Sequence, residues 1–294
     1  MSEYVISCCS TADLSKAHFE RRGLSYICFH FSLNAKQYFD DLGQSIPFPA
    51  FYQAMRDGAE TKTSQVNMDE FVAYFERFLK AGKDILHVTL SSGLSGVINS
   101  ARLAREHLME KYPERKIAIV DSLAASSGYG LLMDKLCDLR DAGKPMEEVQ
   151  AWAEKNRLRL NHWFFSTDLS HYVKGGRISR AKGVIGNMLH ICPLLNMDGQ
   201  GCLSPQENVR TKRKVISRIV EEMTRSADGG EKYSGKCYIS HSDCAEEAQK
   251  VAALVEQTFP HMEGRVEIND VGTAIGSHTG PGTVALFFWG KERK

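Results

Sequence analysis

Residues 87–104, HVTLSSGLSGVINSARLA, join an apolar run to a helical pattern through a short segment of serines and glycines. The run 84–90 predicts a buried strand, and the residues after the junction predict a helix that extends to about Met109. In an open parallel sheet, ligands lie beyond the carboxyl ends of the strands, where the N-terminus of a helix offers unpaired N–H groups. The glycines let the backbone approach a ligand, and the serines add donors without bulk. Residues 91–96 are therefore predicted to receive an anion.

A catalytic nucleophile, a phosphate cradle and a passive anion site are three readings of this junction. A nucleophile elbow has the pattern G-x-S-x-G, but here Gly96 follows Ser95 one position too early. The chain contains no G-x-x-x-x-G-K-[ST] phosphate loop and no dinucleotide-binding fingerprint. For a serine at such a place, as Ser91 and Ser92 are, helix capping is the commoner role, and it is compatible with ligand binding.

Strand and helix patterns alternate outward from this junction. Strands are predicted at 4–7, 25–33, 84–90 and 116–122, and further helices at 68–82, 130–143 and 146–160. This alternation is typical of a parallel sheet that helices cover on both faces.

The pattern changes after about residue 160. A strand is predicted at 162–169, followed by a hairpin at 192–205 that turns at Asp198-Gly199. The remaining predicted elements are a helix at 209–224, a strand at 236–242, a helix at 245–259 and a strand at 283–290. The fold class is therefore α/β with two domains. Residues 1–160 form an N-terminal domain with a mainly parallel sheet flanked by helices, and residues 161–294 form a C-terminal α/β domain with a mixed sheet.

The composition excludes several classes of protein. The 294 residues carry a formal net charge of +1, so neither nucleic acid nor a membrane surface is expected as the main partner. The N-terminus has no signal-peptide features, and no apolar run approaches the length of a membrane span. The eight cysteines form no CxxC pair, which favours reduced thiols and a cytoplasmic location. No cluster of ligands has zinc-site spacing, so no metal is expected.

Three more segments resemble the first junction in being rich in hydroxyl groups and small residues. They are TKTSQVN (61–67), DSLAASSGYG (121–130) and VGTAIGSHTGPGT (271–283), the last of which places His278 among glycines. Each segment alone is weak evidence, and a histidine between glycines is most often structural. Four such segments in one chain, three of them expected at one edge of the sheet, indicate a shared binding site.

In these segments the sequence resembles the DegV family of bacterial fatty-acid-binding proteins, over essentially the whole chain. The motifs that carry the resemblance are STADLS (10–15), KTSQ (62–65), SSGLSG (91–96), DS…SSGYG (121–130), YVKGGRIS (172–179), PLLNMDGQG (193–201) and IGSHTGPG (275–282). The resemblance implies two α/β domains with a long-chain fatty acid between them, no catalysis by the chain itself and no cofactor. It also implies that a separate fatty acid kinase, the partner, converts the presented acid to an acyl phosphate for phospholipid synthesis.

The resemblance also implies which residues meet the ligand. Hydroxyl groups hydrogen-bond the carboxylate, with a histidine nearby, and these positions correspond to Thr63, Ser95 and His278 in this chain. The neighbouring candidates are Ser64, Ser92 and Gly93.

Two positions depart from the family pattern. Cys9 stands where the family usually has aspartate before Ser-Thr, and Val66 follows the TSQ motif where proline is usual. Neither departure removes the hydroxyl groups that are expected to meet the carboxylate.

Two segments are rich in basic residues, and the ordinary interpretation of each is a solvent-exposed surface. Residues 172–183 are predicted to form a loop, which Arg177 would order near the mouth of the ligand site. Arg210 is predicted at the start of a basic helix, where a docking patch for an acidic kinase surface is the sharper alternative.

The expected function is that of a carrier for a long-chain fatty acid. Two alternatives remain: a serine hydrolase or acyltransferase that uses Ser95 with His278, and a binding module for a phosphorylated metabolite. The absence of Lys and Arg from the motifs 91–96 and 275–282 counts modestly against phosphate.

Overall fold

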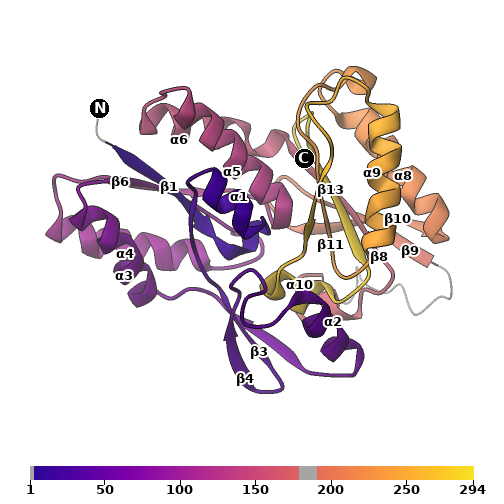
Figure 1. Cartoon of the computed structure of the whole chain (residues 1–294), viewed down its shortest axis with the longest axis horizontal. Helices are drawn as coiled ribbons and strands as arrows, with labels where there is room; N and C mark the ends of the chain where they lie inside the picture. Colours follow the sequence, from indigo (N-terminus) through magenta and orange to yellow (C-terminus); the bar gives the residue numbers. More distant parts are fainter. Residues whose placement is uncertain (1–2, 179–190) are drawn as a thin grey trace.

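The computed structural model of the chain describes residues 3–178 and 191–294, in which the strands form three sheets (Figure 1). The first sheet, sheet A, is parallel, as predicted. Its strands in spatial order are β2 (Ser25–Ile27), β1 (Tyr4–Cys9), β6 (Asp84–Thr89) and β7 (Ile117–Asp121). Strand β6 is buried throughout because helices cover both faces of the sheet.

The four longer helices of this half follow the predicted pattern, whereas the short helix at 16–21 was not predicted. The helices are α1 (Lys16–Arg21), α3 (Met68–Lys80), α4 (Val97–Lys111), α5 (Ser126–Asp141) and α6 (Met146–Asn156), with the 3-10 turns η1 (Ser10–Ala12) and η2 (Arg157–Arg159). Helix α3 begins at a capping box, in which Asn67 and Glu70 bond each other's backbone N–H groups. Its apolar positions recur at helical spacing and pack into the core, which explains why the sequence pattern predicts this helix well.

The second large sheet, sheet C, is mixed, which confirms the predicted fold class. Its strands in spatial order are β10 (Leu203–Arg210), β9 (Ile191–Met197), β8 (Leu160–Ser166), β13 (Thr283–Trp289), β11 (Tyr238–His241) and β12 (Glu267–Asp270). Helices α8 (Lys212–Ser226) and α9 (Ala245–Thr258) pack on its outer face, near the turn η3 (Gly230–Lys232). The predicted hairpin is present, because β9 and β10 pair antiparallel around Asp198 and Gly199.

Helix α5 lies between the two large sheets (Figure 1). It contacts β1 on one side and β8, β11 and β13 on the other, and most of its residues are buried. A Cβ atom at Gly128 would lie 2.5 Å from both His162 and Phe287, so a glycine is required for this close approach to sheet C. The apolar core is continuous across both sheets. The division into two domains at residues 160 and 161 stays a prediction.

A third sheet and two further helices were not predicted either. Sheet B consists of β4 (Lys36–Phe39), β3 (His30–Leu33) and β5 (Thr61–Ser64), and the helices are α2 (Phe48–Arg56) and α10 (Thr273–Thr279). Strands β3 and β5 and helix α2 contact α10, and the Tyr52 hydroxyl donates to the carbonyl of Val271 at 2.7 Å. Sheet B thus joins the N-terminal half of the sequence to the C-terminal half (Figure 1).

The single strand predicted at 25–33 is wrong. It is two strands in different sheets, because the backbone leaves sheet A after Ile27 and pairs in sheet B from His30 onward. At the break, the N–H of Phe29 donates to the side chain of Ser10 and its carbonyl accepts from Asp40.

The helix predicted to begin at 209 begins later. Strand β10 continues to Arg210, which therefore lies at the end of a strand and not at the start of a helix. Thr211 caps α8 by accepting from the N–H of Lys214. The loop predicted at 172–183 is partly helical, since α7 (Ser170–Lys174) covers its first residues. Residues 179–183 lie outside the described residues.

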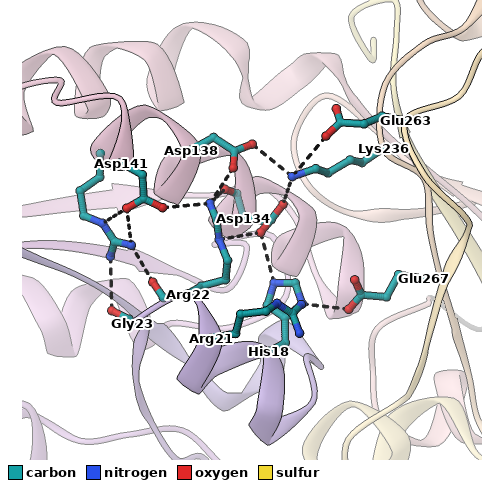
Figure 2. Close-up of polar contacts among 11 residues, drawn as sticks. His18, Arg21, Arg22, Gly23, Asp134, Asp138, Asp141, Lys236, Glu263 and Glu267 are labelled. Atoms are coloured by element: carbon teal, nitrogen blue, oxygen red, sulfur yellow. Dashed lines mark hydrogen bonds and ion pairs between the residues drawn. The ribbon is translucent and has the colours of Figure 1, made fainter.

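Charged side chains tie the N-terminal helices to sheet C (Figure 2). Asp134 on α5 pairs with Lys236 at 2.6 Å, with Arg22 at 3.0 Å and with His18 at 3.3 Å. The other ring nitrogen of His18 lies 2.9 Å from Glu267 on β12. Burial lowers the pKa of His18, but its hydrogen bonds to the two carboxylates outweigh burial and raise the pKa above its ordinary value. The network is completed by Arg21, Gly23, Asp138, Asp141 and Glu263.

Candidate functional site

A cavity of about 470 Å³ lies between sheet A and sheet C, within the usual size range of small-molecule sites. It opens at the carboxyl ends of β1, β6 and β7, as expected for a parallel sheet. All four hydroxyl-rich segments of the sequence contribute to its lining, although they lie far apart in the chain. One cavity therefore brings the four segments together, and their role in ligand binding stays a prediction.

Many of the residues that line the cavity are apolar. Sheet C supplies Phe164 and Ala285, which are paired across β8 and β13, and Phe287 two residues further along β13. Because side chains two residues apart on a strand share a face, these residues line the same surface. Other apolar lining residues are Phe29, Leu90, Leu94, Tyr172, Met197, Leu203, Val271, Ala274 and Ile275.

Thr63 and His278 meet in the lining of the cavity, 215 positions apart in sequence. Together with Gln65, Ser95 and Arg177 they form a group of polar side chains, termed the polar end. The hydroxyl oxygen of Thr63 lies 2.7 Å from Nε2 of His278. Burial, and then the charge of Arg177, lower the pKa of His278 to about 4, so the ring is neutral at physiological pH. The Nδ1 atom packs against Gly175, has no hydrogen-bond partner among the described residues and leaves no room there for a Cβ atom.

Ser95 also lines the cavity, next to Gln65. Its hydroxyl donates to Oε1 of Gln65 at 3.1 Å and accepts from the N–H of Val97 at 3.3 Å. The Nε2 group of Gln65 in turn donates to Ser100 at 3.1 Å. Gln65 belongs to the KTSQ motif, but its amide was not singled out as a functional group from the sequence.

Arg177 joins the lining of the cavity. Its guanidinium donates to the carbonyls of Gly175 at 2.5 Å and Leu94 at 3.3 Å, and thereby ties the segment after α7 to the loop after β6. The predicted ordering role of Arg177 agrees with these bonds. Arg177 therefore adds a positive charge to the hydroxyl and imidazole groups that line the cavity.

The other candidate residues are placed differently. Ser64 is exposed and lines the cavity, whereas Ser92 and Gly93 are exposed and do not. The N–H of Ser92 donates to the carboxylate of Asp121 at 3.1 Å. Arg210 lies on sheet C outside the cavity lining.

The suggestion that Ser91 or Ser92 caps the helix is wrong. Helix α4 has Gly96 at its N-cap, without a side-chain cap. Ser91 is fully buried and donates to the carbonyl of Gly201 at 2.8 Å, which holds the junction against the β9–β10 hairpin. A Cβ atom at Gly93 would lie 2.6 Å from the same carbonyl oxygen, so this contact requires glycine.

The two departures from the family pattern lie in the core and not in the cavity lining. Cys9 is fully buried, its N–H donates to the Tyr129 hydroxyl at 3.0 Å, and burial raises the pKa of its thiol to about 12. Val66 is fully buried in the same core. None of the eight cysteines, all of which the structure describes, forms a disulfide.

Two general features bear on the class of ligand. Among residues 3–178 and 191–294, no three His, Cys, Asp or Glu side chains are grouped to hold a metal ion. In the same part of the chain, no helix has the length and apolar character needed to cross a membrane. Chemically, the cavity offers apolar side chains together with the hydroxyl, imidazole and guanidinium groups of Thr63, Ser95, His278 and Arg177. Other polar residues in its lining are Thr11, Ser126, His162, Ser240 and Thr283.

Comparison with known proteins agrees with this arrangement. A family model described as an uncharacterised protein of the DegV family matches residues 6–291. A DegV domain-containing protein of Clostridium perfringens is 35% identical over 294 residues, which is 100% of both chains. Another, from Lactococcus lactis, is 33% identical and covers 95% of this chain and 94% of its own.

Solved structures with the same fold include proteins named for fatty acid binding. A DegV family protein from Thermus thermophilus, whose structure is described as fatty acid binding, superposes with a TM-score of 0.87 at 25% identity, over 99% of this chain and 100% of that one. DegV of Bacillus subtilis, described as a fatty acid binding protein, has a TM-score of 0.83 at 26% identity with the same coverage. Fold, cavity and sequence together show that this chain is a member of the DegV family.

Proposed function

We propose that this protein binds one long-chain fatty acid in the cavity between sheets A and C and presents its carboxylate to a separate fatty acid kinase. The observation that carries the proposal is the polarity of the cavity. Apolar side chains line the cavity, and Thr63, Ser95, His278 and Arg177 supply hydrogen-bonding groups beside the exposed Ser64 and Gly96. The acyl chain lies along the apolar side chains, and the carboxylate lies at the polar end.

The energetics favour such a ligand. Burying methylene groups contributes ~0.8 kcal/mol each, so a chain of about sixteen carbons contributes roughly 10 kcal/mol before the costs of binding. A hydrogen bond to a charged group adds only about 1.5–3 kcal/mol. The tail therefore supplies most of the affinity, and the polar end selects for a carboxylate and fixes its orientation. Without donors, burying the carboxylate would be costly.

Exposure of the polar end supports presentation to a partner. Ser64 and Gly96 both line the cavity and are exposed to solvent, so the polar end is close to the surface. A carboxylate held there is accessible to a second protein, while the tail stays buried. The relatives from Thermus thermophilus and Bacillus subtilis, which are named for fatty acid binding, support the same ligand class. The kinase partner rests on the family resemblance, and the proposed cytoplasmic location rests on the pattern of cysteines.

The geometry favours a binding protein over a serine hydrolase. The hydroxyl of Ser95 donates to Gln65, and Nε2 of His278 pairs with Thr63. A nucleophile and its base need a hydrogen bond between them, and both of these groups are bonded elsewhere. The lowered pKa of His278 also makes it a weak base at neutral pH. The apolar wall likewise favours an acyl chain over a phosphorylated metabolite.

The proposal is tested by titrating the protein with palmitate labelled with ¹³C at its carboxyl carbon. The expected result is one protein-bound carboxyl resonance that saturates at one equivalent. The variant Thr63→Val with Ser95→Ala should shift or lose this resonance, whereas the control Ser92→Ala should keep it, because Ser92 lies outside the cavity lining. An unchanged resonance in the double variant would place the head group elsewhere. For presentation, a fatty acid kinase and ATP should form a hydroxylamine-trappable acyl phosphate only with the wild type and the control.

A further inference from the structure

Gln65 occupies a position between two hydroxyl groups at the polar end of the cavity. It is half-buried and lines the cavity. Its Oε1 atom accepts from Ser95 at 3.1 Å, and its Nε2 group donates to Ser100 at 3.1 Å. One side chain thus joins the head-group serine to helix α4, on which Ser100 lies.

A count of protons shows a conflict between this arrangement and carboxylate binding. A serine hydroxyl has one proton to donate and two lone pairs that accept. The proton of Ser95 is directed to Gln65, and one lone pair accepts from the N–H of Val97. A carboxylate ligand can only accept. In this arrangement Ser95 therefore has no proton to offer to the carboxylate.

Turning the amide of Gln65 over removes the conflict. The terminal torsion of glutamine has a broad, roughly two-fold profile, so a half-turn exchanges oxygen and nitrogen at little cost. Ser100 can accept from Nε2 or donate to Oε1, and it keeps its bond in both orientations. After the turn, Nε2 donates to Ser95, and the Ser95 proton is free to point at the ligand. Ser95 then donates to the ligand and accepts from Nε2 of Gln65, while Ser100 donates to Oε1 of Gln65.

We propose that Gln65 is a positioning residue that sets the head-group specificity of the site through the direction of its hydrogen bond to Ser95. The proposal rests on the proposed function, because it assumes that the ligand's carboxylate lies beside Ser95. With the amide turned over, the site accommodates a carboxylate. With the amide as in this structure, the free lone pair of Ser95 accepts from a donor such as an alcohol. Glutamine can support both states because it carries a donor and an acceptor on one group.

The variant Gln65→Glu separates these two states. A glutamate at this position can only accept, so it retains the Ser95 proton permanently. Palmitate binding should weaken by about 10- to 100-fold, as expected for one lost hydrogen bond to a charged group. Binding of hexadecanol should be unchanged. The near-isosteric variant Gln65→Met, which removes both amide groups and leaves the Ser95 proton free, should keep the preference for the acid.

The experiment measures Kd for palmitate and for hexadecanol in the wild type, both Gln65 variants, the single variant Ser95→Ala, and Gln65→Glu in the Ser95→Ala background. Simple repulsion between the new glutamate and palmitate would weaken binding equally in the Ser95→Ala background and would overturn the proposal. An unchanged ratio of acid to alcohol affinity in Gln65→Glu would also overturn it, as would loss of the acid preference in Gln65→Met. A wild type that binds no palmitate would overturn the proposed function as well as the role of Gln65.

Discussion

Replacing Gly175 by alanine tests how closely the polar end of the cavity is packed. Gly175 follows α7 with φ −75°, which any residue adopts, so alanine introduces no backbone strain. At a position with room for the methyl group, such a change stabilises by about 0.4–1 kcal/mol. Here the added Cβ would overlap Nδ1 of His278 and lie 3.1 Å from the carbonyl oxygen of His171. A lower free energy of unfolding in Gly175→Ala would therefore indicate close packing around Gly175, and a higher one would indicate room for the methyl group.

The expected magnitude follows from these contacts. Overpacking of one methyl group costs typically about 1–3 kcal/mol. Moving the His278 ring also lengthens its 2.7 Å hydrogen bond to Thr63, at a cost of about 1 kcal/mol. Gly175→Ala should thus lower the free energy of unfolding by about 2–4 kcal/mol, the sum of the two costs. The assay is urea unfolding at pH 7 with far-UV circular dichroism.

A double-mutant cycle provides the control. His278→Ala removes the ring that the new methyl group meets, so Gly175→Ala in that background should cost much less. The difference between the two backgrounds is the coupling between positions 175 and 278. An equal destabilisation in both backgrounds, or a stabilisation in the wild-type background, would refute the packing described for the head-group end.

Three further predictions concern stability and ligand binding. His18→Gln should destabilise the protein more at pH 6 than at pH 8, as measured by urea unfolding. The raised pKa of His18 means that its charged form stabilises the folded state. This stabilisation is complete below the unfolded-state pKa of about 6.5 and is lost as pH rises through the folded-state pKa. A loss that is independent of pH would contradict this linkage. Thr63→Val with Ser95→Ala should weaken palmitate binding by about 10-fold or more in a fluorescence displacement assay and leave the fold intact, because two donors to the carboxylate are removed; unchanged affinity would mean a different head-group site. Ala285→Phe should shorten the longest acyl chain that binds, since Ala285 lines the apolar wall, and a chain-length series from C12 to C18 tests this expectation. An unchanged length preference would place the tail elsewhere.

Sequence patterns predicted best what depends on local periodicity. The parallel sheet, α3 and the β9–β10 hairpin were predicted from apolar spacing and turn residues. The strand predicted at 25–33 failed because the partner of the backbone changes at Phe29, and only the tertiary fold determines that change. Helix α10, with the sequence TAIGSHT, has weak intrinsic helix propensity and packs against sheet B. Its formation therefore depends on contacts that no local pattern contains.

The candidate site divides in the same way. The motifs pointed to Thr63, Ser95 and His278, and the fold brings all three into the lining of one cavity. The apolar wall was not predictable, because a cavity-lining Phe164 has the same sequence signature as a core phenylalanine. The role of Gln65 depends on distances to two serines, and those distances exist only in the fold.

The most direct test of the central claim is to identify what the protein carries when it is purified. Denaturing organic extraction followed by mass spectrometry should release one long-chain fatty acid per protein molecule, and the same result should follow incubation of a delipidated sample with a fatty acid mixture. An extract without an acyl ligand, both before and after that incubation, would contradict the assignment of the cavity to a fatty acid.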